Sequence, residues 1–251
     1  MTALLPTGSP IVLLNAFPVD RAQWEPLIAL LGDYDGDIIA FDMPGIGEMP
    51  LPDEEPSLDL IADAAVLAMR EATGHDAAIW VGCSMGGYVA MAVAERHPGA
   101  VAGLALLDTR STADDEAGVA KRLALADSLA GHSGVADPVA MAEGLVGTQG
   151  ESREALVNQV ADNIIRHSGD GIAWGQRAMA ARPDRTQVLR TVDAPSVVIM
   201  GERDTITGME HAKVMAGALG IEVTVIEGAG HVSALEAPQA VYEAIAPLLN
   251  R

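Results

Sequence analysis

A five-residue segment, Gly82-Cys83-Ser84-Met85-Gly86, constrains the fold of this chain more than any other feature. It follows the apolar run 77–81 and precedes residues 87–94, which have the composition of a buried helix. A serine between two glycines, at a sharp turn from a strand into a helix, forms a nucleophile elbow. The turn strains the serine backbone, and glycines two positions before and two positions after the serine let strand and helix approach closely. The sequence therefore predicts a Ser84 hydroxyl that projects above the edge of a sheet.

Cys83 is the other nucleophilic side chain in this segment. A turn centred on Cys83 would need glycines at positions 81 and 85, which are occupied by Val81 and Met85. We therefore interpret Cys83 as a small, buried apolar residue. The alternative to a nucleophile elbow is a glycine-rich turn between a strand and a helix that has no catalytic role.

Short apolar runs alternate with amphipathic segments along most of the chain. Six runs are expected to be strands buried on both faces: 11–14, 37–41, 77–81, 101–107, 196–200 and 222–226. Helices are expected between them at 20–31, 57–73, 86–96, 208–218 and 238–249. Asp20 and Ser57 are expected to cap the first two of these helices. This alternation predicts an α/β fold with a doubly wound, mainly parallel sheet of about six strands.

The alternation stops between positions 109 and 192, where no strand pattern occurs. This segment instead has helical periodicity at 113–130, 138–146, 153–167 and 170–181. We expect a helical cap, residues 111–190, inserted into a core formed by residues 1–110 and 191–251. Such a cap would lie over the carboxyl ends of the strands, where ligands bind in open parallel sheets, and would exclude water from them.

The composition excludes several classes of function. A net charge of −20 argues against binding to nucleic acid or to an anionic membrane surface, because both need clustered lysine and arginine. A single cysteine excludes an internal disulfide. No apolar run has the length of a membrane span and no signal-peptide pattern is found, so we expect a cytoplasmic protein without a membrane partner. The sequence does not predict an oligomeric state.

A serine hydroxyl is a weak nucleophile near neutral pH, and it needs a base that is oriented by an acid. The chain supplies both after the predicted cap, in the order Ser, Asp, His that is typical of this kind of fold. Asp204 follows the fifth strand and His231 follows the sixth, so both should reach the sheet edge where Ser84 emerges. Asp108, at the end of the fourth strand, is the alternative acid. The other histidines lack such a setting: His75, His97, His132, His167 and His211.

With these residues the chain resembles the α/β-hydrolase superfamily, in particular its small members with a single cap. The matching segments are 13–18, 41–47, 82–87, 201–204 and 228–231. The resemblance implies a serine hydrolase without cofactor or metal, which cleaves a small ester or lactone through an acyl-enzyme with a Ser-His-Asp triad. Carbon–carbon bond hydrolases, enol-lactonases of acidic substrates and cofactor-free haloperoxidases remain alternatives, as does a non-catalytic ligand-binding member of the fold.

Acyl transfer also needs two N–H groups directed at the developing oxyanion. Met85, the residue after the serine, would supply one, and Phe17, in the loop after the first strand, would supply the other. Family members usually have His-Gly where this chain has Asn15-Ala16. Because only ten residues precede the first strand, we expect the fold to lack its usual N-terminal antiparallel hairpin.

The substrate pocket should be lined by residues of the core and the cap. We expect Met43, Met141, Trp174 and Arg177 to bind the substrate, with plain core packing as the alternative for the apolar three. Arg177 or Arg182 would bind the carboxylate of an acidic substrate. The sequence does not indicate the acyl or alcohol group or the pathway.

Overall fold

The computed structural model describes residues 8–249, and residues 1–7, 250 and 251 lie outside the described part. The described part contains one sheet of six strands: β1 (Ile11–Leu14), β2 (Ile38–Phe41), β3 (Ala78–Cys83), β4 (Val101–Leu107), β5 (Ser196–Gly201) and β6 (Val223–Ile226). All neighbouring strands are parallel, in the order β2-β1-β3-β4-β5-β6. The predicted doubly wound sheet is therefore confirmed. The expected absence of an N-terminal hairpin concerns positions that lie partly outside the described residues.

The strand order changes direction at β1. After β1 the chain crosses to β2 on one side, and it then returns to β3 on the other side of β1. Loops that leave the carboxyl ends of β1 and β3 therefore diverge, which leaves room for a ligand between them. Asn15 and Ser84 are the first residues of these two loops. The topology thus brings the predicted elbow and the predicted oxyanion loop to one place.

Helices cover both faces of the sheet. On one face lie α1 (Glu25–Leu30) and α11 (Pro238–Leu249), and on the other lie α2 (Leu58–Thr73), α3 (Met85–Arg96) and α9 (Met209–Leu219). Side chains of each strand alternate between the two apolar layers, so that Trp80 packs towards α2 and α3 whereas Val81 packs towards α1 and α11. Because both faces are covered, the strands are apolar at successive positions.

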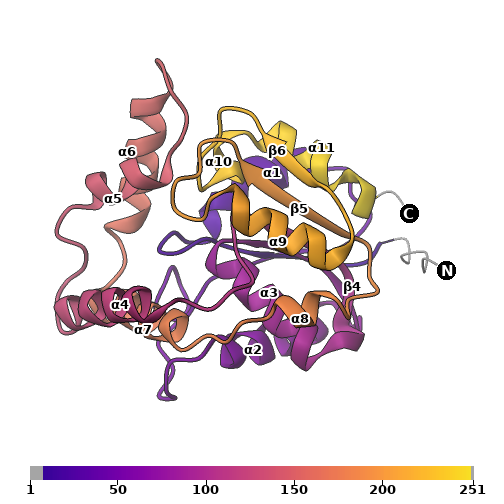
Figure 1. Ribbon diagram of the computed structural model, residues 1–251, viewed down its shortest axis with the longest axis horizontal. Coiled ribbons are helices and arrows are strands. Elements are labelled where there is room, and N and C mark those ends of the chain that lie inside the picture. The colour runs from indigo at the N-terminus through magenta and orange to yellow at the C-terminus, as the bar shows by residue number, and fades with distance from the viewer. Residues whose placement is uncertain (1–7, 250–251) are drawn as a thin grey trace.

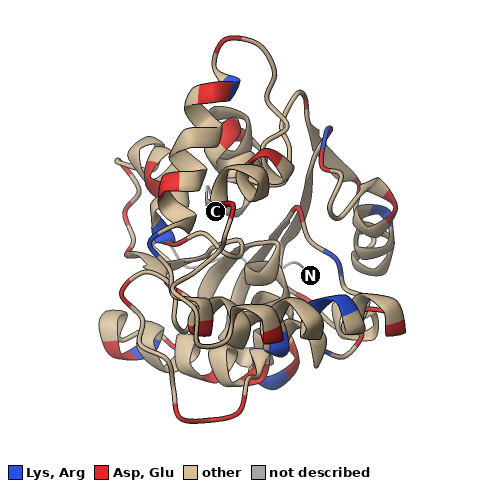
Figure 2. Cartoon of the chain, turned by 90° about the vertical axis from the view of Figure 1, so that its left-hand side faces the viewer, with Lys and Arg blue, Asp and Glu red and all other residues tan. Residues whose placement is uncertain are grey.

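Five helices lie between β4 and β5: α4 (Glu116–Leu129), α5 (Pro138–Leu145), α6 (Arg153–Ile164), α7 (Gly169–Ala180) and α8 (Thr186–Leu189). Figure 1 shows α4 to α7 at the left of the sheet as two pairs, with α4 beside α7 and α5 beside α6. The first pair extends the apolar layer of one sheet face, and the second pair extends that of the other. Figure 2 faces this end of the molecule and shows acidic residues spread over its helices and loops.

The structure adds short elements that the sequence does not predict. These are a 3-10 helix, Pro98–Ala100, together with α8 and α10 (Ser233–Glu236), all shorter than two α-helical turns. At that length an apolar repeat cannot be recognised. The helix expected at 20–31 is divided into a 3-10 helix, Arg21–Trp24, and α1. None of the helices in the described part has the length and apolar character needed to cross a bilayer.

Candidate active site

Ser84 occupies a sharp turn between β3 and α3. Its backbone has φ 51° and ψ −113°, a conformation that side chains rarely adopt. A Cβ on Gly82 would lie 2.3 Å from the carbonyl oxygen of Gly86, and a Cβ on Gly86 would lie 2.0 Å from that of Leu14. Neither position accepts a side chain without movement of the backbone. Close approach of strand and helix therefore explains both glycines of the elbow.

The Ser84 hydroxyl is joined by hydrogen bonds to a histidine and a carboxylate. Ser84 Oγ lies 2.7 Å from His231 Nε2, and His231 Nδ1 lies 2.9 Å from Asp204 Oδ2. The structure thus brings together the three residues that the sequence singles out, and the side chains of His231 and Asp204 are buried. When Nδ1–H donates to Asp204, Nε2 can accept the proton of the serine hydroxyl.

The loop after β5 holds Asp204 as a charged carboxylate. Its Oδ1 accepts hydrogen bonds from the backbone N–H groups of Ile206, at 2.8 Å, and Thr207, at 3.1 Å. Burial alone would raise the pKa of Asp204, but the hydrogen bond and charge of His231, with these N–H groups, lower it below its usual value. The carboxylate can therefore fix the orientation of the imidazole near neutral pH.

Asp108, the alternative acid, has different partners. Its Oδ1 accepts the Gly201 N–H at 2.8 Å, and its Oδ2 accepts the Ser233 N–H at 3.1 Å and the Ser233 hydroxyl at 2.5 Å. Burial raises the pKa of Asp108 to about 7, although the nearby His231 lowers it. Among the described residues, Asp204 and not Asp108 has the hydrogen bond to the ring of His231.

Cys83 is buried and its Sγ lies 3.5 Å from the carbonyl oxygen of His231. Burial raises the pKa of this thiol well above its usual value, and the charge of Asp108 adds to that effect. Since the thiolate is the reactive form, Cys83 is a poor nucleophile here. The interpretation of Cys83 as a small buried residue is confirmed.

The loop after β1 is tied to the elbow. The Asn15 carbonyl accepts a hydrogen bond from the Gly86 N–H at 3.2 Å. The Asn15 side-chain amide donates to the carbonyls of Ala16 and Val19 within the same loop. Ala16 is anchored further because its N–H donates to the Gln23 side chain at 2.9 Å. These bonds define the shape of the loop that carries Phe17.

Two backbone donors beside Ser84 are unused. The N–H groups of Phe17 and Met85 have no hydrogen-bond acceptor in the part of the chain that the structure describes. Met85 is the first residue of α3, where N–H groups have no partner inside the helix and where the helix dipole is positive. Phe17 lies in the loop after β1, and Met85 directly follows Ser84 at the start of α3. Their role as oxyanion donors remains a prediction.

A cavity of about 190 Å³ lies at Ser84 and His231. Loops and α3 of the sheet region contribute Phe17, Pro18, Tyr88, Arg110, Ile206 and Thr207 to its wall. The helical segment between β4 and β5 contributes Arg122, Met141, Leu145, Gln176 and Met179. Pockets for drug-sized ligands occupy about 300–1,000 Å³, so this cavity suits a small molecule.

The predicted substrate-binding residues lie in different places. Met141 lines the cavity, whereas Met43, Trp174 and Arg177 are not among its lining residues. Met43 is fully buried in the core, Trp174 is largely buried, and Arg177 forms an ion pair at 2.9 Å with Asp127. A role for each of the four in substrate binding remains a prediction.

Two cavity residues, Arg110 and Arg122, are not among the residues that the sequence singles out. Arg110 lies three positions beyond the end of β4, and that position at a carboxyl strand end is the available signal for it. Arg122 lies within α4, and only the packing of α4 brings it to the cavity. The described residues contain no group of three or more histidine, cysteine, aspartate or glutamate side chains that is arranged to hold a metal ion.

The sequence model of the alpha/beta hydrolase fold family matches residues 9–238. This chain belongs to the α/β-hydrolase family. The family prediction is therefore confirmed, and with it the prediction of a hydrolase at the level of the family.

Proteins similar to this α/β hydrolase are named for different activities. It is 29% identical to a thermophilic esterase from Thermogutta terrifontis, solved with malate bound, with a TM-score of 0.88 over 97% of this chain and 90% of that chain. It is 27% identical to the 2-succinyl-6-hydroxy-2,4-cyclohexadiene-1-carboxylate synthase of Enterobacter sp. (strain 638), over 96% of this chain and 91% of that protein.

A third relative is longer than this chain. The dihydrolipoyllysine-residue acetyltransferase component of the acetoin cleaving system from Pseudomonas putida is 28% identical over 97% of this chain, but the match spans only 64% of that protein. The chain thus covers less than two thirds of this relative's length. Because the three relatives carry three different activities in their names, the comparisons establish the family and leave the substrate open.

Proposed function

We propose that this chain is a serine hydrolase that cleaves a small carboxylic ester or lactone through an acyl-enzyme. The observation that carries the proposal is the hydrogen-bonded series Ser84–His231–Asp204, with distances of 2.7 and 2.9 Å. Strained backbone such as that at Ser84 costs of order 1–3 kcal/mol and persists mainly at functional sites. A protein that only bound a ligand would have no need of a strained serine aligned with a base and an acid.

In the first half of the reaction, Ser84 Oγ attacks the carbonyl carbon while His231 Nε2 takes the hydroxyl proton. The tetrahedral intermediate then expels the alcohol, which receives this proton from His231, and the acyl group remains bonded to Ser84. With a lactone, the alcohol stays attached to the acyl group. Asp204 stabilises the imidazolium and keeps its ring oriented throughout.

In the second half, a water molecule attacks the acyl-enzyme and gives its proton to His231 Nε2. Collapse of the second intermediate breaks the bond between the acyl carbon and Ser84 Oγ, and His231 returns the proton to the serine. The N–H groups of Phe17 and Met85, which have no acceptor within residues 8–249, would hold the oxyanion in both halves. Loss of one such donor costs about 2.7–4 kcal/mol of transition-state stabilisation in related sites.

We also assign residues 111–190 as a cap over the core formed by 1–110 and 191–251. The cavity wall supports this assignment, because five of its residues come from the helical segment. The contact between α7 and the oxyanion loop supports it too, since a Cβ on Gly175 would lie 2.4 Å from Cε2 of Phe17. A cap packed this closely limits access of water to the reacting carbonyl.

Turnover of 4-nitrophenyl acetate tests the proposal. Ser84→Ala should lower kcat/KM by at least about 1,000-fold, because the nucleophile is lost while the fold is retained. Cys83→Ala is the matched control, since it removes the neighbouring nucleophile and should change kcat/KM by less than about threefold. Equal turnover by the wild type and Ser84→Ala, or loss of turnover only in Cys83→Ala, would contradict the proposal.

A further inference from the structure

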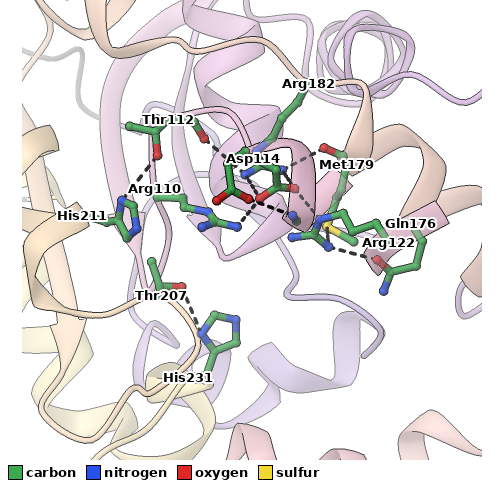
Figure 3. Close-up of polar contacts among 12 residues, drawn as sticks. Arg110, Thr112, Asp114, Arg122, Gln176, Met179, Arg182, Thr207, His211 and His231 are labelled. Atoms are coloured by element: carbon green, nitrogen blue, oxygen red, sulfur yellow. Dashed lines mark hydrogen bonds and ion pairs between the residues drawn. The ribbon is translucent and has the colours of Figure 1, made fainter. Parts of the chain in front are cut away.

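Three arginine side chains, those of Arg110, Arg122 and Arg182, converge on the buried carboxylate of Asp114 (Figure 3). Asp114 Oδ2 accepts hydrogen bonds from Arg122 Nε at 2.6 Å and from Arg182 Nη1 at 2.7 Å. Asp114 Oδ1 accepts from Arg182 Nη2 at 2.9 Å and from Arg110 Nη2. Burial alone would raise the pKa of Asp114, but the hydrogen bonds and charges of Arg182 and Arg122 lower it well below its usual range. The cluster therefore holds two more positive charges than negative ones.

Arg182 is the structural member of this cluster. Its side chain is only 2% exposed and is not part of the cavity wall. Besides Asp114, it donates to the carbonyls of Met179, at 2.8 Å, and Thr112, at 3.2 Å. Its guanidinium carbon also lies 4.3 Å from the centre of the Tyr88 ring, a cation–π contact. Arg182 thus fixes Asp114, which in turn orients the other two arginines.

Arg110 and Arg122 face the cavity that contains Ser84 and His231. Their side chains are 22% and 20% exposed. Within residues 8–249, Arg110 has Asp114 as its one hydrogen-bond partner, while Arg122 Nη1 also donates to Gln176 Oε1 at 3.0 Å. The Nε and Nη1 atoms of Arg110 and Nη2 of Arg122 donate to no group among these residues.

Asp114 cannot satisfy these remaining donors. It already accepts four hydrogen bonds, which is about the number that the lone pairs of a carboxylate can accept. No aspartate or glutamate of the described residues lines the cavity, although the chain as a whole has a net charge of −20. A cavity wall with two charged, partly unused guanidinium groups is suited to an anion.

We propose that the substrate carries a carboxylate on its non-reacting part, and that Arg110 and Arg122 bind this carboxylate while Ser84 attacks the ester or lactone carbonyl. The planar guanidinium group matches the two oxygens of a carboxylate, as the contacts with Asp114 themselves illustrate. A cavity of about 190 Å³ restricts the substrate to a short acid. This inference rests on the proposed serine hydrolase activity, because it places both groups of the substrate in one cavity.

Matched pairs of substrates separate this role from a purely structural one. The 4-nitrophenyl monoesters of succinic, glutaric and adipic acid carry the carboxylate at three distances, and the corresponding methyl 4-nitrophenyl diesters lack the charge. We would measure kcat/KM for each pair, after subtraction of uncatalysed hydrolysis, with the wild type and with Arg110→Met, Arg122→Met and Arg122→Lys. Arg190→Met is the control, because Arg190 is an exposed arginine outside the cavity wall.

The wild type should prefer the acid over the diester for at least one chain length. Arg110→Met and Arg122→Met should lower kcat/KM for that acid by about 10- to 100-fold, as expected for loss of a charged hydrogen bond, and change the diester by less than about threefold. Arg122→Lys should lie between the wild type and Arg122→Met, and Arg190→Met should match the wild type.

An acid-to-diester ratio that is the same in the wild type and both methionine variants, with diester turnover intact, would overturn the carboxylate site and leave the hydrolase activity standing. Absence of turnover of every ester by the wild type would instead overturn the proposed function. If Arg122→Met does not fold, the acid-to-diester ratio of Arg110→Met tests the carboxylate site alone. Arg110 is the safer substitution because Asp114 is its one hydrogen-bond partner within residues 8–249. Inhibition of diester turnover by inorganic phosphate but not by glutarate would contradict the choice of a carboxylate.

Discussion

Ser233 donates both its backbone N–H and its hydroxyl to the same carboxylate oxygen of Asp108, at 3.1 and 2.5 Å. Ser233 lies two residues after His231, so Asp108 anchors the loop that carries the histidine. Asp204, in contrast, accepts a hydrogen bond from the ring itself. The two buried aspartates therefore have different roles: Asp108 holds the loop after β6, and Asp204 orients the imidazole of His231.

This separation predicts unequal losses of activity. Asp204→Asn should lower kcat for ester hydrolysis by about 100- to 10,000-fold, because the imidazole loses its orientation and the stabilisation of its charge. Asp108→Asn should lower kcat by less than about tenfold, since the hydrogen bond between Asp204 and the His231 ring is retained. Steady-state kinetics of both variants, each shown to be folded by circular dichroism, checks the prediction. A larger loss in Asp108→Asn than in Asp204→Asn would reverse the assignment.

Asp108 should also make stability depend on pH. Its pKa is about 7 in the folded protein and 3.8 as an ordinary aspartate. Between these values the folded chain keeps a proton that the unfolded chain has released, so the free energy of unfolding falls as pH rises, by up to about 1.4 kcal/mol per pH unit. Urea unfolding between about pH 5 and 7 should show a steeper decline for the wild type than for Asp108→Asn. Parallel curves for the two proteins would argue against a raised pKa.

Replacement of glycine by alanine should have opposite effects on stability at the elbow and in α9. Gly86→Ala places a Cβ 2.0 Å from the Leu14 carbonyl oxygen, and should destabilise the fold by at least about 2 kcal/mol. Gly217→Ala is the control, because no atom lies within 4 Å of a Cβ at this position of α9. It should stabilise the protein by about 0.5–1 kcal/mol, through helix propensity. Urea unfolding measures both, and equal effects would contradict the close approach at the elbow.

Asn15 should influence catalysis through the oxyanion loop. Asn15→Ala removes the amide that donates to the carbonyls of Ala16 and Val19, and the loop should then hold the Phe17 N–H less firmly. We expect kcat for an ester to fall by about 10- to 100-fold with little change in KM, because the oxyanion forms only in the transition state. An unchanged kcat, or an increase in KM alone, would show that Asn15 does not support an oxyanion donor.

Much of this fold can be predicted from local patterns. The runs at β1 and β3 are apolar at successive positions because helices cover both sheet faces, and such a run is visible without any knowledge of tertiary contacts. Short helices such as α10 cannot be predicted in this way, since four residues contain no apolar repeat.

In the candidate site, too, some residues can be predicted from local sequence patterns and others cannot. Ser84, Asp204 and His231 follow strands and lie in turns marked by glycine, so sequence position alone brings them to one edge of the sheet. Arg122 has no such mark, because the packing of α4 against α7 decides which arginine of the helical segment faces the cavity. Arg177, which the sequence singles out for substrate binding, forms an ion pair with Asp127 and is not among the lining residues of the cavity.

The most direct test of the central claim is covalent labelling of the protein with a fluorophosphonate, followed by peptide mass spectrometry. Ser84 Oγ should carry the adduct, because His231 Nε2 lies 2.7 Å from it and can remove its proton. The adduct should be absent in Ser84→Ala and form far more slowly in His231→Ala. Labelling at another residue, or equal labelling of Ser84→Ala, would contradict the account.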